Sequence, residues 1–230
     1  MSLWKNDKEL FQIAHEELFC ALVGDILDTM GLQNQFVSRQ VKPVADDMVV
    51  IGRAKTVLEC DVKDIALEDH SDPLISQPFG LMFKALDSLK ENEVYVCTGA
   101  SYDYACWGGL MSTRAMHLKA AGAVVNGCHR DSNEILRLGF PSFSVGAYAQ
   151  DQGPRGKVVD FDCKVNFDNI EVHPGDVIFG DRDGVLVIPD AAVEEAFTGA
   201  IEKARGEKTV LKALQQGMST QEAFDTFGIM

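Results

Sequence analysis

The chain has 230 residues, 46% of them hydrophobic and 24% charged, which is long enough for one domain with an ample core. Its formal net charge of -14 opposes non-specific binding to nucleic acid or to anionic lipid, so we expect neither as a partner. No apolar run approaches the length of a membrane span and no signal-peptide pattern opens the chain, so we expect a soluble cytoplasmic protein.

Helices are predicted at the start of the chain, over residues 6–30 and in two segments. Leu22, Ile26 and Met30 recur every four residues, which is the spacing of the buried face of a helix. Gly31 follows them, and a glycine at this position commonly ends a helix. These segments are therefore expected to pack through one apolar face.

A strand is predicted over residues 49–60, with Gly52 as a candidate bulge. The stretch 61–78 that follows is polar and irregular. Two interpretations of it stay open, a lid over a site or a solvated connection. Its polar side chains include Asp64, Glu68, Asp69, His70 and Asp72.

The middle of the chain alternates helices and strands. Helical spacing at residues 81–89 is followed by a strand at 93–98, and a second strand, 123–125, lies between two further helices. Strands that alternate with helices pair in parallel, because each helix crosses over the sheet between them. The carboxyl ends of such strands meet at one edge, where open α/β sheets bind their ligands.

A glycine pair, Gly108 and Gly109, begins the first of these two helices. The backbone amides at the start of a helix have no partner within the helix, and glycines leave them open to an anion. We therefore predict that a carboxylate or phosphate binds at Gly109, Leu110, Met111 and Ser112.

A charged turn, Arg130-Asp131, follows the strand 123–125. Arg130 is a planar cation suited to bidentate carboxylate binding, and Asp131 is an oxygen donor suited to a hydrated divalent cation. Glu134 lies one helical turn further, on the same face as Asp131. The same residues also fit a capping box formed by Asp131 and Glu134, with Arg130 in a surface ion pair.

Other candidate residues near this site each allow two interpretations. Asp103, in the loop 100–107, either reaches the water shell of a metal or forms an ordinary turn. The six cysteines lack the spacing of metal ligands and are interpreted as reduced, mostly buried thiols. Cys106 and Cys128 flank the candidate site, but packing is the commoner role for such residues.

The last part of the chain has short apolar runs separated by turns, which predicts antiparallel strands. Asp190 is then expected to cap a long helix that ends near Gln216, and Ser219 or Thr220 to cap a last short one, within a helical segment 190–228. The predicted strands cover residues 157–167, 169–172, 176–180 and 185–188.

These motifs resemble the RraA-like family, which includes the class II 4-hydroxy-4-methyl-2-oxoglutarate aldolases. The signature is Gly109, twenty residues, Arg130-Asp131, two residues and Glu134. The resemblance implies an α/β protein with the swivelling β/β/α three-layer fold, a parallel central sheet plus an antiparallel sheet, as a single domain over residues 1–230. It also implies a homotrimer or homohexamer. Further segments that resemble the family are Leu22–Gly31, Ile51–Val57, Leu138–Gly146 and His173–Pro189.

The chemistry implied by this resemblance is metal-dependent cleavage of a carbon–carbon bond in a small anionic 2-oxo acid, with release of pyruvate. Asp131 would hold Mg²⁺ or Mn²⁺ largely through water, and Arg130 would stabilise the enolate oxygen. Glu134 would orient a metal water, and Asp103 is a further candidate for the water shell. Glu207 falls near a glutamate that the family donates across the subunit interface, with a plain surface position as the alternative.

The resemblance leaves two other functions open. The family also contains regulators that bind and inhibit an RNA-degrading endonuclease, and Glu134 favours an enzyme because such regulators tend to lack it. A methyltransferase of quinone biosynthesis is disfavoured, because no glycine-rich nucleotide loop is present. Asn126, Cys128 and His129 depart from residues common in the family, which leaves the exact substrate open.

Overall fold

The computed structural model describes residues 3–62 and 73–228, which form two compact units. The larger unit is Asn34–Asp190, and the other combines Met1–Gln33 with Ala191–Met230. The polar side chains of the candidate lid, namely Asp64, Glu68, Asp69, His70 and Asp72, lie outside the described residues.

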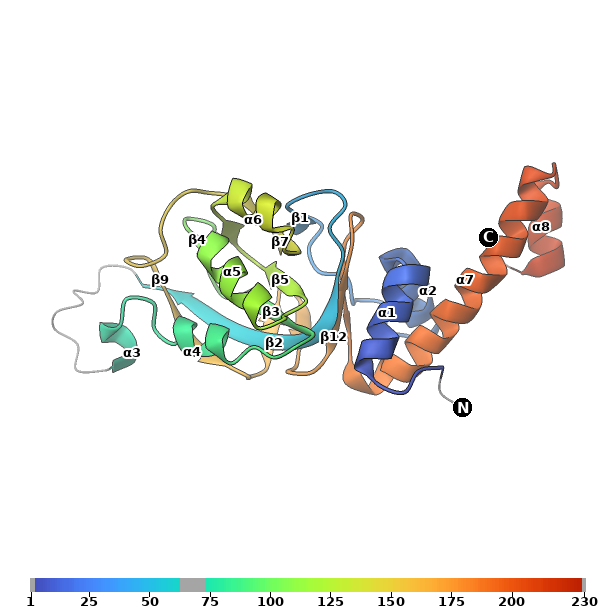
Figure 1. The fold of residues 1–230 in the computed structure, drawn as a ribbon. Coiled ribbons are helices and arrows are strands. Elements are labelled where there is room, and N and C mark those ends of the chain that lie inside the picture. Colours follow the sequence, from blue (N-terminus) through green and yellow to red (C-terminus); the bar gives the residue numbers. More distant parts are fainter. Residues whose placement is uncertain (1–2, 63–72, 229–230) are drawn as a thin grey trace. The chain divides into compact units, whose positions relative to one another are not determined.

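The larger unit is built on β2 (Val50–Asp61), a long curved strand that is buried along most of its length (Figure 1). Three strands follow beside it in order, each parallel to the one before. Their apolar runs are typical of parallel strands, which are covered on both faces. The strands predicted at 93–98 and 123–125 are both present. The three strands are β3 (Glu93–Thr98), β5 (Gly122–Val125) and β7 (Ser142–Ser144).

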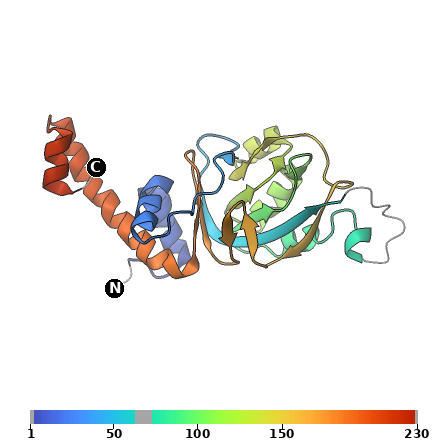
Figure 2. The ribbon, with the colours of Figure 1, turned by 180° about the vertical axis from the view of Figure 1, so that it is seen from behind.

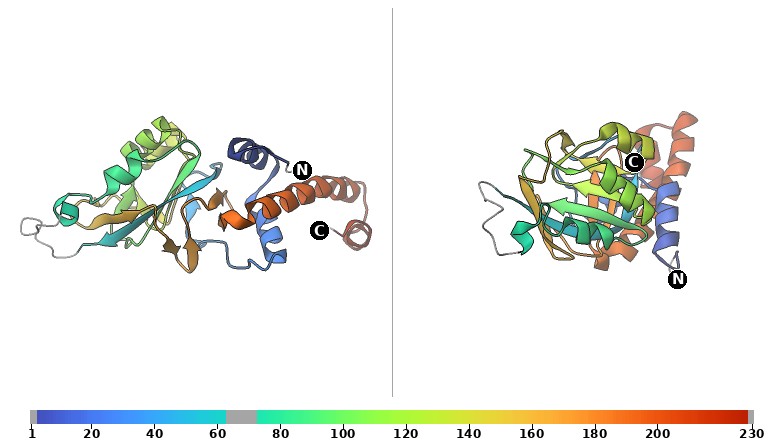
Figure 3. Two further views of the ribbon diagram at one scale, coloured as in Figure 1. Left: turned by 90° about the horizontal axis from the view of Figure 1, so that it is seen from below. Right: turned by 60° about the vertical axis from the view of Figure 1, so that its left-hand side comes forward.

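Short helices connect these strands, and α4, α5 and α6 cover one face of the sheet (Figure 1). The antiparallel pair β10 (Val165–Phe167) and β11 (Ile170–Val172) lies on the opposite side of β2, as the view from below shows (Figure 3). The connecting helices are α3 (Pro73–Ser76), α4 (Met82–Asp87), α5 (Gly109–His117) and α6 (Ser132–Leu138).

Antiparallel strands extend the parallel sheet in both directions. β1 pairs with β7 at one edge, whereas β12 pairs with the start of β2 and β13 with β12. β9 pairs with the end of β2. Figure 2 shows from behind the strands that come late in the sequence, β9 to β13. The predicted α/β fold, with a parallel core and antiparallel strands, is confirmed, and most of these antiparallel strands continue the same sheet. Their bounds are β1 (Lys42–Pro43), β9 (Gly156–Phe161), β12 (Val177–Gly180) and β13 (Val185–Ile188).

Gly52 does not form the predicted bulge. It pairs in register with Ile178, and the irregularity of β2 falls between Leu58 and Glu59. A Cβ at Gly52 would lie 2.3 Å from the backbone oxygen of Asn92, so the close approach of another backbone segment requires the glycine.

A small parallel sheet was not expected from the sequence. It consists of β4 (Ala105–Trp107), β6 (Cys128–His129) and β8 (Gly146–Ala147), in that order. Strands this short carry no readable periodicity, so the sequence predicts only a loop and a turn there. Because β4 and β6 pair, the residues that follow them begin side by side.

The second unit is helical and contains α1 (Asp7–Glu17), α2 (Cys20–Thr29), α7 (Val193–Gln215) and α8 (Thr220–Phe227). Ser219 caps α8 through a capping box with Glu222, one of the two caps predicted. None of the helices in the described residues is sufficiently long and apolar to cross a membrane.

Asp190 does not cap α7, in contrast to the prediction. A 3₁₀ turn, η2 (Asp190–Ala192), precedes the helix, and the N-cap position falls on Ala192. The Asp190 carboxylate instead accepts a hydrogen bond from Arg53 at 2.5 Å. The side chain therefore serves an ion pair within the larger unit.

Candidate active site

Trp107, the last residue of β4, fixes the glycine pair against the core. The indole is buried, with its centroid 5.0 Å from the Tyr95 ring and 6.1 Å from the Phe140 ring. Its Nε1 donates to Ser112 Oγ at 2.8 Å, and that hydroxyl donates to the Gly108 oxygen at 3.0 Å. The first turn of α5 is therefore held in place by buried contacts.

The start of α5 offers two backbone amides to a ligand. The Ser112 amide donates to the Gly108 oxygen at 3.0 Å, and the Gly109 amide donates to Asp131 Oδ2 at 3.1 Å. Helix geometry leaves the amides of Leu110 and Met111 without an acceptor inside α5. Of the four amides predicted to bind an anion, those of Leu110 and Met111 thus remain available.

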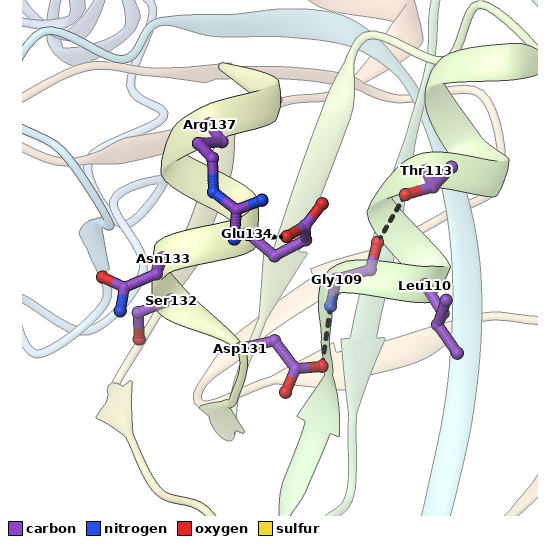
Figure 4. A pocket seen from close by; sticks show the side chains of 8 residues that line it. All are labelled: Gly109, Leu110, Thr113, Asp131, Ser132, Asn133, Glu134 and Arg137. Carbon is purple, nitrogen blue, oxygen red and sulfur yellow. Dashed lines mark hydrogen bonds and ion pairs between the residues drawn. The ribbon is translucent and has the colours of Figure 1, made fainter.

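Asp131 does not cap its own helix. Its backbone is left-handed, with φ 60° and ψ 38°, and its side chain makes no capping hydrogen bond to α6. The carboxylate instead turns toward the start of α5, where Oδ2 meets the Gly109 amide (Figure 4). The capping-box alternative is therefore wrong. A non-glycine residue in this conformation is uncommon and recurs at functional sites.

Helices α5 and α6 approach so closely here that a side chain at either glycine would push against the side chains of α6. A Cβ at Gly108 would lie 2.9 Å from Asp131 Oδ2, and a Cβ at Gly109 would lie 2.8 Å from Glu134 Cγ. The spacing from the glycine pair to Arg130, Asp131 and Glu134 therefore corresponds to a direct contact between two helix starts.

Arg130 lies beside this contact because its amide donates to the Trp107 oxygen at 3.0 Å, continuing the pairing of β4 with β6. Its Nη1 lies 2.7 Å from Asp151 Oδ1, and the two side chains are 39% and 44% exposed. The predicted ion pair therefore exists, with a partner that no sequence motif identified. A guanidinium has five N–H donors, so further donors remain for a ligand.

Two cavities meet at Asp131 and Leu110. The first, of about 600 Å³, is lined mostly by polar residues of α5 and α6 (Figure 4). Glu134 borders it and forms an ion pair with Arg137 at 2.7 Å. Asp131 and Glu134 thus face the same polar cavity.

The second cavity, of about 410 Å³, has a mostly apolar lining that also includes charged side chains. Asp87, Arg114, Arg130, Asp131 and Asp151 line it, together with the start of α5. An apolar pocket with a few convergent polar groups is the usual form of a small-molecule site. Its apolar lining includes Phe79, Met82, Phe83, Leu86, Trp107 and Met111.

His129 is a buried side chain next to Arg130 in the sequence. It is buried, with Nδ1 2.6 Å from Ser144 Oγ and Nε2 3.0 Å from Ser132 Oγ. Burial lowers the pKa of the imidazole, so the neutral form is favoured. The ring therefore connects β7 with the start of α6 without adding charge.

Asn126 and Cys128, which differ from residues common in the family that the sequence resembles, do not line the two cavities that meet at Asp131. Asn126 donates to Asp168 Oδ1 at 3.0 Å and accepts from Tyr102 Oη at 3.0 Å. Cys106 and Cys128 are buried free thiols, and burial raises the pKa of Cys128. Neither cysteine lines the two cavities.

Two predicted outer residues are not brought to the cavities by the described part of the larger unit. Asp103 is exposed, and its amide lies 3.4 Å from Ser101 Oγ in a turn. Glu207 belongs to α7 of the helical unit, where Lys203 Nζ lies 4.0 Å from its carboxylate. Their approach to a metal stays a prediction.

The Asp131 carboxylate suits a hydrated Mg²⁺ or Mn²⁺ in its donor chemistry. It is an exposed oxygen ligand beside a second carboxylate, Glu134, in one polar cavity. Mg²⁺ typically keeps several waters and binds through one or two carboxylates, and it does not require a closed cage of protein ligands. The residues present therefore fit such an ion.

A second group of chemically active side chains lies elsewhere in the core and was not predicted. Glu59, Cys97 and Cys106, from β2, β3 and β4, are buried, with ligand atoms all within 4.8 Å of one another. Cys97 Sγ donates to Glu59 Oε2 at 3.6 Å, and burial raises the pKa of Glu59 to about 7. These residues are far apart in sequence, so only the folded sheet brings them together.

Comparison with known sequences gives a consistent family match. Residues 20–187 match the sequence model of the RraA-like family, described as Aldolase/RraA. Protein DlpA from Legionella pneumophila is 26% identical over 209 residues, which are 90% of this chain and 32% of that protein. The chain thus spans about a third of the length of this relative. A "Putative 4-hydroxy-4-methyl-2-oxoglutarate aldolase" from Halalkalibacterium halodurans is 26% identical over 203 residues, 88% of this chain and 87% of that protein.

Solved structures show the same fold. RraAS2 from Streptomyces coelicolor, described as an unusual member of the RNase ES inhibitor RraA protein family, superimposes with a TM-score of 0.74. The sequences are 21% identical, and the match covers 90% of this chain and 98% of that one. The likeness at this identity concerns the fold alone.

Proposed function

The chain belongs to the RraA-like family, and from this premise we propose that it is a divalent-metal-dependent carbon–carbon lyase. Its substrate would be a 4-hydroxy-2-oxo acid or a β-keto acid, and its product pyruvate. The observation that carries the proposal is the convergence of Arg130, Asp131 and the amides of Leu110 and Met111 at one cavity. The cation and the amides match the anionic head of a 2-oxo acid, and the carboxylate can hold the divalent metal that this head would bind.

The roles of these groups follow from the bonds that must change. In aldol cleavage the C4 hydroxyl loses its proton and becomes a carbonyl, the C3–C4 bond breaks, and its electron pair forms the enolate of pyruvate. Protonation at C3 then completes the product. Mg²⁺ or Mn²⁺, held by Asp131 largely through water, would supply the Lewis acidity that this charge requires. Glu134 would orient one of the waters.

Protein groups would bind and orient the substrate head. The amides of Leu110 and Met111 bind its carboxylate, and Arg130 stabilises the negative charge that develops on the 2-oxo oxygen. The Schiff-base alternative needs an amine, and no lysine lines either of the two cavities in the described part of the chain. This favours the metal-dependent route.

Two further features of the family are carried into the proposal. We expect a homotrimer or homohexamer, in which Glu207 of a neighbouring subunit approaches the metal waters. Light scattering combined with size-exclusion chromatography would give the assembly state. The alternative function is that of a protein regulator, because the related RraAS2 is described among inhibitors of a ribonuclease.

The test is release of pyruvate from oxaloacetate and from 4-hydroxy-4-methyl-2-oxoglutarate, measured by a coupled assay with Mg²⁺. We expect release that stops with a chelator and returns when Mg²⁺ is restored. No release from either compound by folded protein with metal present would contradict the lyase. A pull-down for an endonuclease would then test the regulator.

A further inference from the structure

Much of the lining of the 410 Å³ cavity is apolar. Phe79 and Phe83 meet edge to face, with ring centroids 5.5 Å apart, and Met82 and Leu86 continue the same surface along α4. Trp107 and Met111 border the cavity as well. Beyond the substrate head, a ligand in this cavity therefore meets aromatic and aliphatic side chains.

Some of this apolar surface is open to solvent. Phe83 is 57% exposed and Leu110 is 86% exposed. Large apolar side chains gathered at a cavity commonly mark a binding surface, because burying them against a ligand is favourable. Here they extend from the point where the 2-oxo acid head is expected to bind.

The charges around the cavity suit one carboxylate better than two. Two arginines and three aspartates line it. Arg114 Nε lies 2.7 Å from Asp87 Oδ1, and Arg130 Nη1 lies 2.7 Å from Asp151 Oδ1, so each cation already faces an acid. A divalent ion at Asp131 would balance one substrate carboxylate. A second carboxylate would meet a cation only at Arg114, which the acid Asp87 already faces, and elsewhere it would meet the apolar wall and lose its hydration.

On the basis of the proposed lyase function, we propose that the preferred substrate is a 4-hydroxy-2-oxo acid with an apolar, aromatic-sized group on C4. The head binds at Arg130, Asp131 and the start of α5. The C4 group packs against the surface formed by Phe79, Met82, Phe83 and Leu86, which we call the α4 wall. Cleavage of such a substrate gives pyruvate and an apolar aldehyde, which balances atoms and needs no further reactant.

A pair of non-cleavable ligands tests this preference directly. 2-Oxo-4-phenylbutanoate and 2-oxoglutarate share the 2-oxo acid head and lack the C4 hydroxyl, but one carries a phenyl group and the other a carboxylate. We expect calorimetry with Mg²⁺ to show at least about tenfold tighter binding of the phenyl compound, the usual scale of a filled apolar pocket. The corresponding substrates, 4-hydroxy-2-oxo-4-phenylbutanoate and 4-hydroxy-2-oxoglutarate, are then compared for pyruvate release.

A substitution in the α4 wall tests the contribution of this surface to binding while the residues that bind the substrate head stay unchanged. Phe83→Lys places a cation where the apolar group would pack, and the exposed position of Phe83 should tolerate it. We expect the ratio of the two affinities to fall by about tenfold or more, with a parallel change in the ratio of kcat/KM. Phe36→Lys is the matched control, because Phe36 is 47% exposed and does not line the cavity.

The outcomes distinguish this inference from the proposed function. Equal or tighter binding of 2-oxoglutarate, or an equal effect of Phe83→Lys on both ligands, would overturn the apolar preference even if pyruvate is released. Absence of pyruvate from every substrate, with the phenyl compound still bound more tightly, would overturn the lyase and leave the ligand preference standing.

Discussion

The Asp131 corner (Gly108, Gly109, Arg130, Asp131 and Glu134) and the Glu59 cluster (Glu59, Cys97 and Cys106) both contain acids among close neighbours. Asp131 is exposed, and one of its oxygens is held by a backbone amide. Glu59 is buried, and its Oε1 has no hydrogen-bond partner among the described residues. The first acid is accessible to solvent, whereas the second is enclosed in the sheet.

The comparison shows that solvent exposure decides whether a carboxyl group favours its charged or its neutral form. An exposed carboxylate keeps its charge at low cost and can offer it to a metal or substrate. A buried carboxylate loses its hydration, so its neutral form is favoured and the pKa of Glu59 rises to about 7. We therefore expect changes at the corner to affect activity, and changes at the cluster to affect stability and its pH dependence.

The largest effect is expected for Asp131→Asn. Asparagine tolerates the left-handed backbone of Asp131, so the variant removes the charge with little strain. Pyruvate release should fall by about 10³-fold or more, with unchanged circular dichroism and weaker Mn²⁺ binding in electron paramagnetic resonance titrations. Asp168→Asn, another left-handed aspartate, is the control. Full activity in Asp131→Asn would break the assignment of the corner to catalysis.

Arg130→Ala should have the next largest effect. Loss of a donor that stabilises the enolate oxygen typically costs about 10² to 10³ in rate, and we expect kcat to fall on that scale. Arg182→Ala removes another exposed arginine in an ion pair, 2.9 Å from Asp46, and should leave the rate unchanged. Equal rates for the two variants would mean that Arg130 is only a surface partner of Asp151.

The Glu59 cluster is tested by the pH dependence of stability. Glu59 has a pKa of about 7 in the folded protein against an ordinary value of 4.5. Between these values the folded state holds a proton that the unfolded state has lost, so stability falls as pH rises from 4.5 to about 7 and then levels. The fall amounts to about 3 kcal/mol, because one pKa unit corresponds to about 1.36 kcal/mol.

Glu59→Gln removes the titrating carboxyl group. The stability of the variant should therefore lack the fall between pH 4.5 and about 7 that Glu59 causes, while pyruvate release changes by less than about threefold. Urea unfolding of wild type and variant across pH 4.5 to 8 measures the effect as the change in their difference with pH. Glu91→Gln, an exposed glutamate near Lys119, is the control. If the free energies of unfolding of wild type and Glu59→Gln change with pH in parallel, burial does not neutralise Glu59.

Much of the parallel core could be predicted from sequence. The strand at residues 93–98 and the run 123–125 are apolar and bounded by turn residues, so their local pattern specifies them. The spacing from Gly109 to Arg130, Asp131 and Glu134 also pointed to one site. Local pattern could not choose between two structures that the same residues fit. Asp131 and Glu134, for example, matched both a capping box and a binding site.

Sequence alone determined the class of fold, its principal strands and helices, and the set of residues from which the candidate site is built. Only the tertiary structure decided that Asp131 turns from its own helix to Gly109, that Asp151 pairs with Arg130, and that α4 supplies an apolar wall. The physical reason is range. Hydrophobic periodicity and turn preference act over a few residues, whereas the pairing of β2 with β3 and of β4 with β6, like the packing of α5 against α6, joins segments more than twenty residues apart.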